Sequence, residues 1–126
     1  MVKFSMKNTI IILFIISVFI TSCKTGVEVT FTNQSEEDFK ILTVGILEQR
    51  FDFENLKSGE TTKSIKVAEI YPYCYARAII KNDTLRFVPF DFVGEKLKKH
   101  GKINMKIYID SVSNNKRQLN FLTKKN

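Results

Sequence analysis

The sequence has 126 residues, a formal net charge of +7, two cysteines and no tryptophan. This length is enough for one domain with a hydrophobic core. Two cysteines also exclude a small fold that depends on several disulfides.

The chain begins with a short basic stretch followed by an apolar run. Residues 1–8 carry Lys3 and Lys7 without an acid, and residues 10–20 are apolar except for Ser17. This order is typical of a secretory signal peptide. A helix over the apolar run would extend only about 16 Å, roughly half of the ~30 Å hydrocarbon core of a bilayer. We therefore predict a cleaved helical signal over residues 1–22 rather than a membrane-spanning helix.

The signal ends in Ile20-Thr21-Ser22-Cys23, which resembles the lipobox of bacterial lipoproteins. The resemblance implies that the Cys23 thiol receives a diacylglyceryl group, that the chain is cut before it, and that the new amine is acylated. Two or three acyl chains hold a protein firmly on a membrane. Residues 24–26 reach roughly 10 Å, so we expect the domain to lie close to the headgroups. The alternative is an ordinary secretory signal with a free Cys23.

Charge is uneven along the predicted mature chain. Without Lys3 and Lys7 the net charge is +5; residues 28–60 carry −5 and residues 61–126 carry +9. Such asymmetry favours an anionic partner, such as lipid headgroups or lipopolysaccharide phosphates. Nucleic acid is not expected as a partner, because the chain is predicted to be exported and has no nucleic-acid-binding motif.

Alternating apolar and polar residues predict strands along most of the mature chain. We expect strands at residues 27–32, 39–46, 50–54, 61–68, 73–81, 85–90, 103–110 and 119–123, with turns at 33–38, 56–60, 81–84 and 113–115. Gly45 predicts a bulge or bend in the second strand. Pro89 predicts that the sixth strand ends or lies at a sheet edge.

The strand at residues 73–81 has two distinct faces. Its inward face is predicted to be small and apolar, because Arg77 and Lys81 resist burial: Cys74, Ala76, Ala78 and Ile80. We interpret Cys74 as a buried apolar residue; an intermolecular disulfide and a catalytic thiol are the alternatives. On the other face, Tyr73, Tyr75 and Arg77 would form a flat platform for a sugar ring or peptide, unless the C-terminal tail covers them.

Residues 96–102 are predicted to form a basic loop. Lys96, Lys98, Lys99 and Lys102 are candidates for contact with anionic headgroups; the alternative is a solvated loop that keeps the domain soluble. The only histidine, His100, lies in this loop. We predict no catalytic role for it, because acyl transfer needs a base held firmly beside a nucleophile. One histidine and one buried cysteine also cannot supply a zinc site.

The remaining polar motifs are short. Residues 36–38 are interpreted as a solvated acidic turn rather than a calcium site. Asp52 and Glu54 are interpreted as the exposed side of a strand rather than a glycosidase pair. Asp83-Thr84-Leu85 and Asp110-Ser111-Val112 resemble the O-glycosylation sequon of Bacteroidetes-type bacteria, which makes Thr84 and Ser111 candidate glycan acceptors at predicted turns.

Seven or eight short strands without a convincing helix predict an all-β fold. We expect an antiparallel immunoglobulin-like sandwich over residues 27–126, lacking the Cys–Trp–Cys core, with a small β-barrel as the alternative. Segments 56–60, 73–75 and 91–95 also resemble small, mostly uncharacterised lipoproteins of Bacteroidetes-type bacteria. That resemblance implies no activity.

Together these features predict a lipid-anchored envelope protein with no catalytic activity, metal or cofactor. We expect its domain to bind a protein or glycan beside the membrane. The alternatives are an inhibitor or immunity-type protein that blocks a lytic enzyme with a loop, and an unrecognised enzyme. Lys24 after the cysteine lacks an acidic retention signal, which favours the outer membrane of a Gram-negative bacterium.

Overall fold

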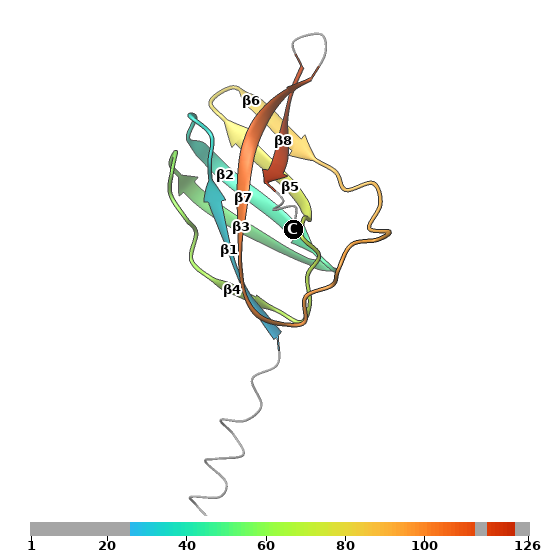
Figure 1. Cartoon of the computed structure of the whole chain (residues 1–126). Coiled ribbons are helices and arrows are strands. Elements are labelled where there is room, and N and C mark those ends of the chain that lie inside the picture. The colour runs from blue at the N-terminus through green and yellow to red at the C-terminus, as the bar shows by residue number, and fades with distance from the viewer. Residues whose placement is uncertain (1–25, 113–115, 123–126) are drawn as a thin grey trace, which may run out of the picture.

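The computed structural model describes residues 26–112 and 116–122 (Figure 1). These residues form strands and connecting loops, and the described part of the chain contains no helix that would cross a membrane. Cys23, the predicted turn at 113–115 and Thr123 lie outside the described residues.

Eight strands build two four-stranded sheets that face each other. The strands are β1 (Gly26–Asn33), β2 (Phe39–Ile46), β3 (Gln49–Leu56), β4 (Ile65–Val67), β5 (Tyr75–Ile80), β6 (Asp83–Phe87), β7 (His100–Val112) and β8 (Lys116–Leu122). Sheet A has the order β4-β1-β7-β8, and sheet B has the order β3-β2-β5-β6. Every pairing is antiparallel except β1 with β7, which is parallel. The prediction of an all-β sandwich is confirmed, and the sheets do not close into a barrel.

The core lies between the two sheets, as strand alternation requires. Sheet A contributes Val27, Val29 and Phe31 from β1, together with residues of β7 and β8. Sheet B contributes the predicted face of β5, where Ala76 and Ala78 are completely buried. The aromatic side chains of sheet A pack against other strands of sheet B: the ring centroid of Phe31 lies 5.9 Å from that of Phe53 in β3, and that of Phe121 lies 5.2 Å from that of Phe87 in β6.

Three sequence predictions about local structure are corrected. The fourth strand is shorter than residues 61–68, because only Ile65–Val67 pair continuously with β1, and Thr61 makes a single bridge to Thr32. The basic loop is also shorter, because β7 begins at His100 and already pairs there with Gly26.

Gly45 makes no bulge in β2, since the register runs unbroken from Leu42↔Phe53 to Ile46↔Gln49. A Cβ at Gly45 would lie 3.5 Å from both Cβ and Cδ1 of Tyr75. Gly45 therefore lies beside the Tyr75 side chain in regular strand geometry, with space for a Cβ at ordinary contact distance. Pro89 behaves as predicted: β6 is an edge strand and ends at Phe87.

Chain direction divides the connections between two ends of the sandwich. The Gly26 end holds the start of β1, turn 47–48, loop 68–74 and loop 88–99, the last of which protrudes sideways from the body (Figure 1). The distal end holds loop 34–38, loop 57–64 and turn 81–82. Because β7 runs parallel to β1, loop 88–99 returns to the end where the chain enters the domain.

Asn33 is a fully buried amide that fastens the distal end. Its Nδ2 donates to the backbone oxygens of Glu37 at 2.8 Å and Leu56 at 3.1 Å. Its Oδ1 accepts from the backbone nitrogen of Ser35 at 3.0 Å and from the Ser35 hydroxyl at 2.6 Å. All four side-chain positions are thus used, and loop 34–38 is tied to the end of β3.

We expect Asn33→Asp to lower the free energy of unfolding by about 3 kcal/mol, because a carboxylate would face two backbone carbonyls it cannot satisfy. Urea unfolding would measure this loss. Asn104→Asp is the matched control: Asn104 also donates from Nδ2 to two side-chain oxygens, those of Thr30 and Thr32, but it is exposed. There the loss should stay below about 1 kcal/mol. Equal losses in the two variants would contradict the role given to Asn33.

Candidate functional site

The outer face of sheet B carries a group of polar and aromatic side chains. Outward positions come from all four strands and alternate with the buried ones: Ile41, Thr43, Gly45, Arg50, Asp52, Glu54, Tyr75, Arg77, Ile79, Thr84 and Arg86. Thr43 lies at the centre, paired with Asp52 on one side and Arg77 on the other. Arg86 continues the same row beyond Arg77.

A short hydrogen-bonded chain holds this row in place. The Thr43 hydroxyl donates to Asp52 Oδ1 at 2.6 Å, and Arg77 Nη2 donates to the Thr43 hydroxyl at 3.4 Å. Arg50 Nε lies 3.4 Å from the same carboxylate oxygen. The hydrogen bond from Thr43, followed by the charge of Arg50, holds the pKa of Asp52 below its ordinary value. Asp52 is therefore a fixed carboxylate and is unsuited to giving up a proton near neutral pH.

Arg77 has hydrogen-bonding capacity that the described residues do not use. Its Nε is buried and has no hydrogen-bond partner among them. Beside it lies a shallow hollow of about 180 Å³, lined by Thr43, Val44, Gly45, Arg50, Tyr75 and Arg77. Two guanidinium groups and one aromatic ring thus border a single depression. Guanidinium groups bind carboxylates in a fork geometry, and aromatic rings pack against sugars and peptides.

Only two members of the predicted tyrosine platform share this face. Tyr75 and Arg77 lie there, whereas Tyr73 precedes β5 and packs elsewhere. Its ring meets Phe87 edge-on at 5.8 Å between centroids and stacks on Phe92 at 5.2 Å. Its hydroxyl donates to the backbone oxygen of Asp91. Partial burial, followed by the charges of Glu95 and Asp91, raises the pKa of Tyr73. Loop 88–95 therefore removes Tyr73 from the platform.

The four candidate lysines are exposed but do not form one loop. Lys98 exchanges two backbone hydrogen bonds with Ile70, and Lys99 borders a hollow with Gly26 and Lys66. Lys102 lies in β7 and is 3.7 Å from the Glu28 carboxylate. Lys96, Lys98 and Lys99 thus belong to loop 88–99, whereas Lys102 belongs to a strand.

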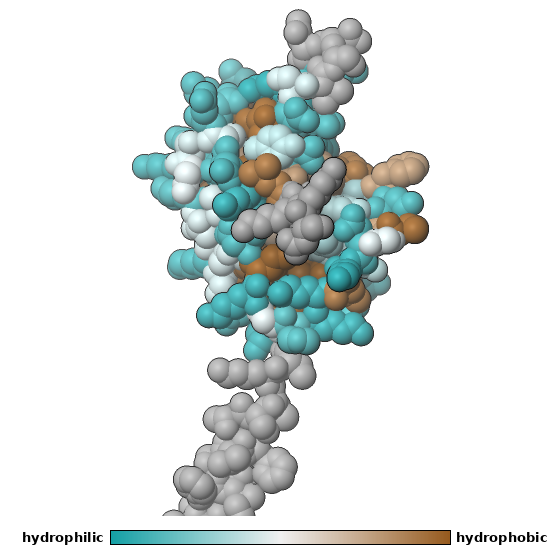
Figure 2. Space-filling model, viewed as in Figure 1, coloured by the Kyte–Doolittle hydropathy of each residue, from teal (hydrophilic) through white to brown (hydrophobic). Residues whose placement is uncertain are grey.

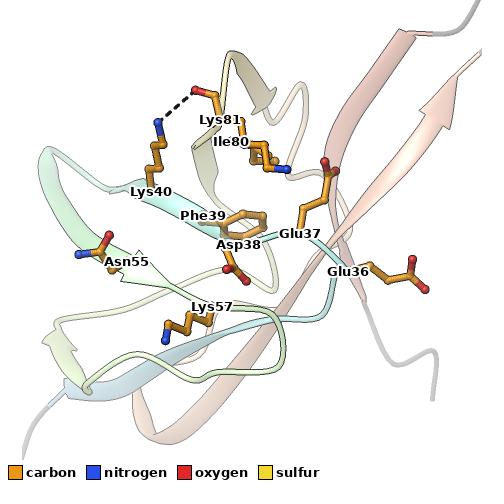
Figure 3. A pocket seen from close by; sticks show the side chains of 9 residues that line it. All are labelled: Glu36, Glu37, Asp38, Phe39, Lys40, Asn55, Lys57, Ile80 and Lys81. Atoms are coloured by element: carbon orange, nitrogen blue, oxygen red, sulfur yellow. Dashed lines mark hydrogen bonds between the residues drawn. The ribbon is translucent and has the colours of Figure 1, made fainter.

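The distal end contains a cleft that the sequence analysis did not find. It measures about 450 Å³, with the buried Phe39 and Ile80 beneath a polar rim of Glu36, Glu37, Asp38, Lys40, Asn55, Lys57 and Lys81 (Figure 3). The three acidic side chains point in different directions in Figure 3. Glu37 pairs with Arg117, and Asp38 Oδ1 accepts from the backbone nitrogen of Ser58 at 2.9 Å. Glu37 and Asp38 therefore hold loops in place, and the three carboxylates do not converge on one point.

The predicted glycan acceptors are exposed, but they lie in strands rather than turns. Thr84 is the second residue of β6 and faces outward on sheet B, and Ser111 lies near the end of β7. Both strands extend further toward their turns than alternation alone indicated. The hydroxyl of Thr84 lies beside Ile79 on the platform face, as the strand register shows.

The remaining chemically reactive residues are placed as follows. Cys74 is only 5% exposed, and burial raises its pKa to about 12. His100 is exposed at the start of β7. Within residues 26–112 and 116–122, no three His, Cys, Asp or Glu side chains are grouped so that they would hold a metal ion.

No protein-family model matches the chain, and neither the curated proteins nor the solved structures include a match. The residues themselves are therefore the basis on which a function is inferred.

Burial of Cys74 predicts a pH-dependent stability. The folded pKa of about 12 lies above the ordinary value of 9.0, so the protonated thiol stabilises the fold below pH 9 and this contribution is lost between pH 9 and 12. Relative to Cys74→Ala, the wild-type protein should lose about 1.4 kcal/mol between pH 8 and 10. Urea unfolding under reducing conditions checks this. A constant difference between the two proteins would show that Cys74 ionises freely in the folded state.

Proposed function

We propose that this protein is a non-enzymatic, lipid-anchored envelope protein that binds a carboxylate-bearing partner, a glycan or a protein segment, on the outer face of sheet B. The observation that carries the binding proposal is the hollow lined by Tyr75, Arg50 and Arg77. Thr43 accepts a hydrogen bond from Arg77 and donates one to Asp52, which holds this row of side chains in place. The sequence motif Ile20-Thr21-Ser22-Cys23 supports the anchor. An immunoglobulin-like topology for the sandwich belongs to the same proposal.

The chemistry of the hollow favours a carboxylate. The Arg77 Nε is a buried donor that has no hydrogen-bond partner within residues 26–112 and 116–122, and Arg50 adds a second cation to the lining of the hollow. A planar guanidinium donates two parallel hydrogen bonds to a carboxylate, which a lysine cannot reproduce. The Tyr75 ring, packed against Gly45, supplies an aromatic surface beside these donors.

A second candidate function is inhibition of a lytic enzyme, and loop 88–95 favours it. The loop protrudes from the body (Figure 1), and its residue Phe90 is fully exposed. The backbone nitrogen of Glu95 donates to the oxygen of Phe92, so a tight turn closes the loop. Inhibition would depend on Phe90, whereas the binding proposal depends on Arg77, so variants of these two residues separate the functions.

Binding can be tested on arrays of acidic and neutral oligosaccharides and peptides. We expect a set of carboxylate-bearing probes to bind, and Arg77→Lys to weaken that binding at least ten-fold through loss of the fork geometry. Tyr75→Ala should weaken it similarly. Lys57→Ala, at the distal cleft, is the control and should bind as the wild type does. Equal binding by all four proteins, or binding to neutral probes alone, would contradict the proposed site.

The anchor can be tested by intact mass after expression in a Bacteroidetes-type host. The wild-type chain should begin at Cys23 and carry the mass of a diacylglyceryl group and an amide-linked acyl chain. Cys23→Ser should lack both and leave the membrane fraction. Glycosylation at Thr84 and Ser111 would add further mass that disappears in Thr84→Ala and Ser111→Ala. A wild-type mass without acyl chains would refute the anchor, and one without hexose would refute the glycan sites.

A further inference from the structure

Exposed apolar side chains are concentrated at one end of the sandwich. At the Gly26 end, four of them project into solvent: Leu47 is 61% exposed, Val88 68%, Phe90 100% and Val93 87%. At the distal end, loops 34–38, 57–64 and 81–82 contain no apolar residue except Gly59. Figure 2 shows apolar atoms projecting from the flank where loop 88–99 protrudes. We name these four residues the apolar flank.

A hydrogen bond and aromatic stacking fix the loop that carries Phe90 and Val93. The backbone nitrogen of Val93 donates to Asp91 Oδ1 at 2.9 Å. Phe92, between the two exposed residues, turns inward and stacks on Tyr71 at 4.4 Å and on Tyr73 at 5.2 Å between ring centroids. Phe92 thus anchors the loop while Phe90 and Val93 are directed outward. Fixing two large apolar side chains in water is unfavourable unless something covers them.

An apolar hollow continues the flank toward the Gly26 end. It has a volume of about 290 Å³, and its lining includes Leu47, Ile70, Tyr71, Pro89, Phe92 and Leu97. Leu47 from the β2–β3 turn and Pro89 from loop 88–99 therefore border one depression. Three separate connections thus contribute to the hollow, and the loop that carries Val88, Phe90 and Val93 is one of them.

Lysines flank this surface, next to the point where the chain enters the domain. Lys96, Lys98 and Lys99 follow the apolar flank in sequence, and Lys99 borders a hollow with Gly26 and Lys66. Acidic residues at the same end include Asp91 and Glu95, so charge alone does not select an anionic surface. The apolar side chains select the environment, and the lysines suit phosphates at its boundary.

We infer that the apolar flank is a bilayer-contacting surface, which seats Phe90 and Val93 among lipid acyl chains and Lys96, Lys98 and Lys99 at the phosphates. This inference draws on the proposed anchor: Cys23 precedes Gly26 by three residues, a reach of about 10 Å. A domain tethered so closely meets the bilayer with its Gly26 end first. Because loop 88–99 protrudes sideways, contact tilts the sandwich onto this flank and leaves the distal end facing away.

The lack of tryptophan allows a direct test. Phe90→Trp introduces a single indole at a fully exposed position, where folding should be undisturbed. The full-length lipidated protein would be reconstituted into phosphatidylcholine–phosphatidylglycerol vesicles with brominated acyl chains. We expect the indole fluorescence of Phe90→Trp to be quenched at least two-fold more than that of Asn82→Trp, which places the probe in the distal turn 81–82.

Two further measurements separate the contributions. Exchanging Lys96, Lys98 and Lys99 for Glu in the Phe90→Trp protein should reduce quenching at least two-fold in vesicles containing phosphatidylglycerol. Val93→Ser in the Phe90→Trp protein should reduce the quenching both in vesicles that contain phosphatidylglycerol and in vesicles of phosphatidylcholine alone. Both changes lie on exposed side chains, so the fold should be retained. Circular dichroism of each variant is the control for this.

Three outcomes would overturn the inference. Equal quenching at positions 90 and 82 in lipidated protein would refute bilayer contact while leaving the anchor intact. A blue shift of Phe90→Trp that grows with protein concentration without vesicles would assign the flank to a second copy of the chain. Loss of lytic-enzyme inhibition in Phe90→Ser, together with no vesicle quenching of the indole in Phe90→Trp, would assign the flank to a protein partner. Failure of the anchor itself would appear separately, as an intact mass without acyl chains.

Discussion

The parallel pairing of β1 with β7 is the constraint on which the arrangement of this molecule depends. Eight residue pairs, from Gly26↔His100 to Asn33↔Ile107, join the first strand of the domain to a strand far along the chain. Parallel strands must start at the same end. The pairing therefore brings the entry of the chain and loop 88–99, with its exposed apolar residues, to one end of the sandwich, and it directs Asn33 to the other.

The two ends then differ in how they are stabilised. The distal end is polar outside and is fixed from within by the buried amide of Asn33, whose hydrogen bonds tie loop 34–38 to the end of β3. The other end uses aromatic stacking among Tyr71, Tyr73 and Phe92, next to the exposed apolar residues of loop 88–99. This difference between the two ends suits a domain with one end in water and the other end in contact with an apolar phase.

Local sequence patterns predicted the structural features that depend on neighbouring residues in the chain. The bounds of β2 and the inward Cys/Ala face of β5 were predictable, because alternation reports directly which side chains avoid water. The sequence analysis could not predict partners: nothing in residues 26–33 indicates that they pair in parallel with residues 100–107. Composition also misplaced the start of β7, because Gly101 and its basic neighbours look like a loop. Gly101 adopts φ 95° while still pairing with Val27.

The candidate site was predictable in part for the same reason. Tyr75 and Arg77 follow the alternation of β5, so their shared face could be read from the sequence. Tyr73 lies two residues earlier, and its packing against Phe87 and Phe92 depends on where a distant loop crosses. The distal cleft combines residues from three separate segments, and no local pattern carries that information.

The edges of the two sheets bear on how the protein behaves when crowded. A lipid anchor would confine many copies to a plane, where unpaired strand edges of adjacent molecules meet often. Sheet A ends in β4, whose three residues offer little length for a foreign strand, and in β8, which begins with Lys116 and Arg117. On sheet B, the edge strand β3 carries the exposed charged residues Arg50, Asp52 and Glu54, and the other edge strand, β6, ends two residues before Pro89. Short, charged or proline-terminated edges hinder lateral strand addition, so copies confined by such an anchor would resist polymerising through their sheet edges.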